Sequence, residues 1–298
     1  MRMLTKISPR ILVLFAFVSM CFVMPSKGFA APTEQELKTI MNLSGKQRML
    51  SQKMAKEALL VVKGLDADAN RKNLQATTDL FKKTLTGLKD GDSTLGLPVH
   101  EYSRIKREID KLQEAYNEVD SIYASIISGT VPTADQLNLM DQKSLAVLTQ
   151  ANKIVELFEL EAKAVTGVGN QELSAQINVA GRQRMLSQKM TKELLLSQAG
   201  VNAEANKGAM NATMGLFENS LKSLREGNKE MGFATGIQDP AILSQLDVVE
   251  KTWGTFKVLM QNAEATPETL DKIKDMNMSL MQEADKVVQA LSVLEVKG

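Results

Sequence analysis

Eight consecutive residues occur twice in this chain, and that repeat constrains the fold more than any other feature. Residues 47–54 read Gln-Arg-Met-Leu-Ser-Gln-Lys-Met, and the same eight residues return unchanged at positions 183–190, an offset of 136. The offset persists downstream, where Phe81 matches Phe217. Self-similarity at a long fixed period indicates that one structural unit is present more than once.

The repeat divides the chain into two units of similar length. After a three-residue deletion, residues 151–155 align with residues 284–288 at an offset of 133. We therefore predict a first module over residues 31–166 and a second over residues 171–298. The junction, residues 166–170, contains two glycines and is predicted to be a flexible break.

Each module is predicted to hold four helices. Apolar residues recur at spacings of three and four over long stretches, and the internal prolines fall between those stretches. Thr33 with Glu36 and Thr133 with Gln136 have the spacing of capping boxes. Asp239 and Thr266 each precede a proline that would begin a helix. The predicted helices cover residues 34–63, 67–90, 99–128, 133–165, 171–199, 203–227, 240–264 and 267–296.

Long helices with short connections favour antiparallel bundles. The predicted fold class is therefore all-α, with two tandem antiparallel four-helix bundles related by internal duplication.

The composition excludes several function classes. The chain has one cysteine and one histidine, so Cys/His metal sites, a Cys–His nucleophile pair and a disulfide framework are excluded. Lys and Arg total 36 against 35 Asp and Glu, which argues against a strongly basic nucleic-acid surface. No nucleotide-binding glycine loop or nucleophile elbow is present. We expect no enzyme activity, no cofactor and no bound metal, and we expect His100 to be exposed.

Residues 1–30 read as a secretory signal peptide. A basic start precedes an apolar run over residues 11–24, and small residues at positions 28 and 30 suit cleavage after Ala30. Fourteen apolar residues are short of the roughly 20 that span a bilayer, so a retained anchor is the less favoured alternative. We expect a periplasmic protein with no transmembrane segment after cleavage.

The predicted helix that carries the octamer has two distinct faces. At 100° per residue, Leu50 and Met54 share an apolar side that should pack inside its own bundle. A small residue, an arginine and an amide line the opposite side in both copies, which suits close packing around a polar ligand. Packing of the two modules without a ligand is the alternative. The candidate ligand-binding residues are Gly45, Arg48, Gln52, Gly181, Arg184 and Gln188.

The Gly-x-Gln-Arg-Met-Leu-Ser-Gln-Lys-Met pattern on an N-terminal helix resembles a known family. It is similar to the N-terminal, PilJ-type domain of type IV pilus methyl-accepting chemotaxis transducers, and through it to the periplasmic domain of nitrate/nitrite sensor kinases. The resemblance covers two copies and is strongest at residues 44–60 and 180–196. It implies four-helix bundles that pair along their first helices, with one arginine from each gripping a nitrate.

In this chain the matching arginines are Arg48 and Arg184, so one molecule would form the pair that its relatives form between two. The sensor-kinase motif has an aromatic residue where this chain has Gln52 and Gln188, so the resemblance carries over the arginines and leaves the anion open. It implies a sensor-like protein that binds a small, nitrate-like anion and reports to a membrane sensor kinase or chemoreceptor. The alternative is a structural or interaction module that docks to pilus, chemoreceptor or other envelope components.

Overall fold

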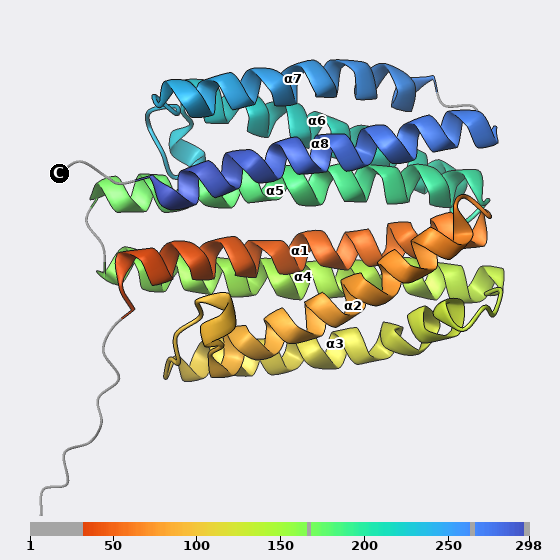
Figure 1. The fold of residues 1–298 in the computed structure, drawn as a ribbon, viewed down its shortest axis with the longest axis horizontal. Helices are drawn as coiled ribbons and strands as arrows, with labels where there is room; N and C mark the ends of the chain where they lie inside the picture. Colours follow the sequence, from red (N-terminus) through yellow and green to blue (C-terminus); the bar gives the residue numbers. More distant parts are fainter. Residues whose placement is uncertain (1–31, 166–167, 263–265, 295–298) are drawn as a thin grey trace, which may run out of the picture. The chain divides into compact units, whose positions relative to one another are not determined.

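The computed structural model describes residues 32–165, 168–262 and 266–294 (Figure 1). Apart from two isolated bridges, the regular secondary structure of these residues is helical, as predicted. The long helices are α1 (Glu34–Val62), α2 (Ala67–Asp90), α3 (Ser103–Ile127), α4 (Ala134–Val165), α5 (Val168–Gln198), α6 (Ala203–Glu226), α7 (Pro240–Gln261) and α8 (Pro267–Val293). Short 3-10 turns, η1 (Ser93–Leu95) and η2 (Lys229–Met231), follow α2 and α6.

The eight long helices of the described residues form two bundles. In the first, α1 packs against α2 and α4, and α3 packs against α4; in the second, α5 packs against α6 and α8, and α7 against α8. The bundles meet where α1 lies along α5 in the same direction, with α4 and α8 on the flanks (Figure 1). The predicted fold class is confirmed.

The capping predictions are confirmed in detail. Thr33 Oγ1 accepts from the backbone N–H of Glu36, whose carboxylate accepts from the N–H of Thr33, so the capping box is closed. Asp239 and Thr266 cap α7 and α8 immediately before prolines. Each cap supplies an acceptor to N–H groups that have no partner within the helix.

Two predicted boundaries and the predicted exposure of His100 need correction. Residues 99–102 are a loop, and α3 begins at Ser103. His100 in that loop is buried, because its Nε2 lies 2.8 Å from the carbonyl oxygen of Leu88 and its ring packs on Phe158. The break predicted at residues 166–170 is shorter than expected, since α5 already begins at Val168. Residues 166–167, the end of the seventh predicted helix and the last residues of the eighth lie outside the described residues.

The two modules share unusual backbone as well as sequence. Asp66 and Asn202, before α2 and α6, hold φ angles of 42° and 45°. Left-handed conformations are uncommon outside glycine and best tolerated by Asp and Asn. These residues occupy equivalent positions, so the turn between the first two helices has the same backbone conformation in both modules.

No helix of the described ranges is long and apolar enough to cross a membrane. The predicted signal peptide lies outside these ranges.

Candidate site at the contact between the two motif helices

The duplicated octamer makes the same contacts in both modules. In the first, Gln47 Nε2 donates to the carbonyl oxygen of Phe81, and Lys53 pairs with Glu57 and with Thr77. In the second, the equivalent bonds join Gln183 to Phe217 and Lys189 to Glu193 and Thr213. One face of the octamer therefore joins its helix to the next helix of its own bundle.

The opposite face of each octamer helix lies at the contact between the modules, called here the inter-module interface. The polar residues predicted for the site are at most 2% exposed there. Burial of both copies of this face against each other explains why it is duplicated so closely. The residues that contact the other module are Gly45, Arg48 and Lys56 of α1 and Gly181, Arg184 and Lys192 of α5. Gln52 and Leu59 of α1, and Gln188 and Leu195 of α5, are buried on the same face of these helices.

The structure brings the two predicted arginines together over the two predicted glycines. Nη2 of Arg48 and Nη2 of Arg184 each lie between 3.2 and 3.7 Å from the position that a Cβ atom would take on Gly45 or Gly181. Both guanidinium nitrogens are thus within about 7 Å of one another, a distance at which like charges repel appreciably. A Cβ atom on Gly45 would crowd Arg48 Nη2 at 3.2 Å, whereas one on Gly181 would be in ordinary contact with Arg184 Nη2 at 3.4 Å.

Each arginine reaches across to the other module. Arg48 Nη2 donates to the carbonyl oxygen of Asn178 at 3.2 Å, and Arg184 Nη2 donates to that of Asn42 at 3.3 Å. Asn42 and Asn178 are equivalent in the repeat, so the two bonds are related by a pseudo-two-fold axis. The Nε of both arginines is buried without a hydrogen-bond partner. Each guanidinium therefore keeps donor capacity that the protein does not use.

The two arginines differ in their counter-charge. Arg184 Nη1 lies 2.5 Å from Asp285 Oδ1 and also donates to Asn42 Oδ1 at 2.9 Å. Arg48 Nη1 has only a 3.4 Å contact to the neutral amide oxygen of Asn152. Burial and the neighbouring cations lower the pKa of Arg48 to about 9, so it stays protonated at neutral pH. Burial also lowers the pKa of Arg184, and Asp285 opposes that effect.

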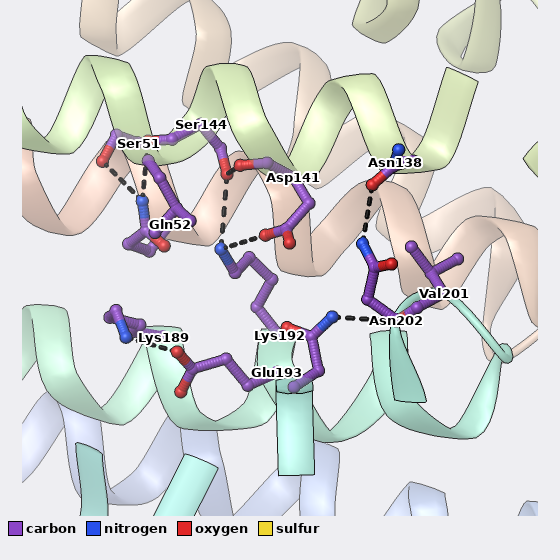
Figure 2. Close-up of polar contacts among 12 residues, drawn as sticks. Ser51, Gln52, Asn138, Asp141, Ser144, Lys189, Lys192, Glu193, Val201 and Asn202 are labelled. Carbon is purple, nitrogen blue, oxygen red and sulfur yellow. Dashed lines mark hydrogen bonds and ion pairs between the residues drawn. The ribbon is translucent and has the colours of Figure 1, made fainter. Parts of the chain in front are cut away.

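The predicted glutamines lie one helical turn further along the interface. Gln52 Nε2 donates to the carbonyl oxygen of Ser144 at 3.0 Å and to Ser51 Oγ, as Figure 2 shows. Gln188 Nε2 donates to Ser187 Oγ. The N–H groups of both amides are thus engaged within the protein, while their Oε1 atoms are buried without donors.

Two buried lysines at the interface were missed by the sequence reasoning. Lys192 of α5 reaches α4, where its Nζ lies 2.7 Å from Asp141 Oδ1 (Figure 2). Lys56 of α1 reaches α8 and donates to Asn277 Oδ1 at 2.8 Å. Burial lowers the pKa of Lys56 to about 8. Their signal was available, because each lysine follows a candidate glutamine by four residues and so shares its face of the helix.

Comparison with known proteins identifies the modules. The sequence profile of the family described as "Type IV pili methyl-accepting chemotaxis transducer N-term", or PilJ, matches residues 33–140 and again residues 169–277. The chain belongs to this family. Each PilJ match contains one copy of the octamer and one of the paired arginines. The predicted resemblance, in two tandem copies, is confirmed.

A curated relative points the same way. The chain is 30% identical over 118 residues to the methyl-accepting chemotaxis protein McpN of Pseudomonas aeruginosa. That alignment covers 39% of this chain and spans 22% of the length of the relative. The tandem PilJ modules are therefore related to the sensor part of chemotaxis transducers, which is a non-catalytic family.

Proposed function

We propose that this protein is an exported, non-enzymatic binding protein that holds a small, nitrate-like anion between its two PilJ modules. The observation that carries the proposal is the convergence of two buried guanidinium groups over Gly45 and Gly181. At a separation of at most about 7 Å and an effective dielectric near 20, two such charges repel by at least roughly 2 kcal/mol. An anion between them would replace that repulsion with attraction and accept forked hydrogen bonds from both.

The unused donors support the same proposal. Both Nε–H groups lack an acceptor, and Arg48 bonds only to neutral oxygens at 3.2 and 3.4 Å. Buried donors without partners are costly, so an oxyanion would satisfy groups that the protein leaves open. The two Nη2 groups occupy the space over both glycines, so the anion we propose is a small one that enters between them.

Binding at this position supports a signalling role. The anion would draw α1 and α5 together, whereas without it the like charges favour separation. A ligand that prefers one spacing shifts the population toward that spacing. The relation to a chemotaxis protein supports a membrane chemoreceptor or sensor kinase as the partner that receives this change. The signal-like residues 1–30 support a periplasmic location.

One observation favours the interaction-module alternative. Arg184 is already paired with Asp285 and bonded to Asn42, so it holds α5 to α8 and α1 without any ligand. In this alternative the interface is a rigid clamp, and the outer surfaces dock to pilus, chemoreceptor or other envelope components.

A thermal-shift screen distinguishes the anion-binding proposal from the interaction-module alternative. The protein from residue 31 onward is melted with nitrate, nitrite, sulfate, phosphate and short carboxylates at matched ionic strength. An anion present at 100 times its Kd stabilises the folded protein by about 2.7 kcal/mol and so raises its melting temperature. We expect at least one of these anions to raise the melting temperature. The rise should disappear in Arg48→Ala and in Arg184→Ala. Arg107→Ala, which removes an exposed arginine of α3, is the matched control. No shift at millimolar concentration for any anion would leave the clamp as the better account.

A further inference from the structure

The arginine pair is duplicated, but its immediate counter-charge is not. At the offset of 133, Asn152 of α4 and Asp285 of α8 occupy the same position in their modules. We propose that Asp285 sets the charge of the ligand, so that the site accepts a singly charged anion and Arg48 is the arginine that binds it most directly. This inference rests on the proposed function and deepens it.

Asp285 is a firmly held member of the site. Its Oδ1 lies 2.5 Å from Arg184 Nη1, and its Oδ2 accepts from Gln289 Nε2 at 2.6 Å. Asn152, its counterpart, makes only the 3.4 Å contact to Arg48. One guanidinium is therefore neutralised by direct contact and the other is not.

A neutral residue can occupy the position of Asp285 in this fold. In the first module α4 packs on α1 with an asparagine at the same position. The acid in the second module therefore changes the charge of the site and adds an ion pair between α8 and α5.

The groups in direct contact at the site carry one net positive charge, because the two arginines and Asp285 sum to one positive charge.

A single positive charge in a buried site selects for one negative charge. A monoanion neutralises the site, whereas a dianion leaves a net negative charge that is removed from water and is not compensated. Arg48 offers the monoanion its unpaired Nε and a guanidinium that contacts no carboxylate directly. Arg184 offers the anion its unpaired Nε, while its Nη1 stays paired with Asp285.

Titration calorimetry at matched ionic strength tests this with three anions and four variants. Sulfate and perchlorate share a tetrahedral shape and differ in charge, and nitrate is the planar monoanion. We expect the unaltered protein to prefer the monoanions. Asp285→Asn should raise the affinity for sulfate relative to perchlorate by about tenfold or more. Asn152→Asp should lower the affinity for both monoanions by about tenfold or more.

The exchange of both residues makes the test specific. Asn152→Asp combined with Asp285→Asn keeps the net charge and moves the acid to the other arginine, so monoanion preference should return. Asp275→Asn on the same helix neutralises a carboxylate whose side chain is 78% exposed, and it should change neither affinity. Circular dichroism confirms that each variant is folded. A sulfate-to-perchlorate ratio unchanged by Asp285→Asn would overturn this inference while leaving the anion site intact. Absence of binding by every anion to the unaltered protein would refute the proposed function and this inference with it.

Discussion

At the scale of single residues, the two modules use the same buried cations with different counter-charges. A buried cation is costly unless a carboxylate or several hydrogen bonds compensate it. Both interface cations of α5 have a carboxylate in direct contact, and both of α1 face a neutral amide instead. The pairs are Arg184 with Asp285, Lys192 with Asp141, Arg48 with Asn152 and Lys56 with Asn277. The duplicated interface is therefore electrically unequal, with the uncompensated charge on α1.

Lys56 allows a direct test of that inequality through pH. Burial lowers its pKa from 10.5 to about 8. Between these values the unfolded chain holds a proton that the native protein has released, so stability rises with pH across this window. Relative to Lys56→Met, the unaltered protein should gain about 2 kcal/mol in the free energy of unfolding between pH 7.5 and pH 10.

Urea unfolding of both proteins at several pH values measures this difference. The hydrogen bond lost to Asn277 adds a nearly constant offset and does not change with pH. Lys63→Met, at the partly buried end of α1, is the matched control and should show a smaller dependence. A difference between the unaltered protein and Lys56→Met that is flat with pH would show that Lys56 keeps an ordinary pKa.

At the scale of elements, the sequence predicted the helices well because their start signals are local. Capping residues, prolines and the spacing of apolar residues act within a few positions, so the limits of α2 and the start of α8 agree with prediction. Contacts between distant residues were harder to foresee. His100 is buried because α2 and α4 enclose it, and nothing beside it in the sequence indicates that.

The candidate site shows the same contrast between features that the sequence indicates and contacts that only the fold creates. Arg48 and Arg184 could be predicted to converge because the family resemblance implies bundles that pair along their first helices, and the repeat supplies both helices in one chain. Lys56 was missed because a lysine on the edge of a helical stripe is normally solvated, and its burial depends on α8 from the other module. Asp285 was missed because its contact with Arg184 joins α8 to α5, and nothing beside it in the sequence indicates that contact.

Two glycines inside helices separate the effect of helix propensity on stability from the effect of close packing. Gly254 of α7 is exposed with open space around it, so Gly254→Ala should stabilise the protein by about 0.5–1 kcal/mol through helix propensity. At Gly45 a Cβ atom would lie 3.2 Å from Arg48 Nη2. We expect Gly45→Ala to gain nothing in stability and to weaken anion binding. Urea unfolding and calorimetry measure both effects, and an equal stability gain at the two positions would contradict a tight approach at the interface.

At the scale of the whole compact unit, the duplication places within one chain a pair of first helices that face each other. The same eight residues serve the core of each module on one side and the partner module on the other. Separation of the modules would expose Leu59 and Leu195, which are at most 1% exposed, along with the buried arginines and lysines. The unpaired cations would gain hydration, but the burial of apolar surface and the hydrogen bonds between the modules would be lost. We therefore infer that the modules stabilise each other.

Mutual stabilisation predicts that a change in one module lowers the stability of the other. Phe81 of the first module is fully buried and stacks on Tyr116 at 4.7 Å, so Phe81→Ala should cost about 3–5 kcal/mol. Trp253, the single tryptophan of the chain, lies in the second module and stacks on Phe217. If the modules unfold as one cooperative unit, the urea midpoint that Phe81→Ala gives by Trp253 fluorescence should fall together with the midpoint from circular dichroism.

Phe217→Ala provides the reciprocal control in the second module, and it also alters the stacking of Trp253. A Trp253 midpoint that stays in place while the circular dichroism splits into two transitions would show that each module unfolds alone. The anion between them would then have to act on two independent domains.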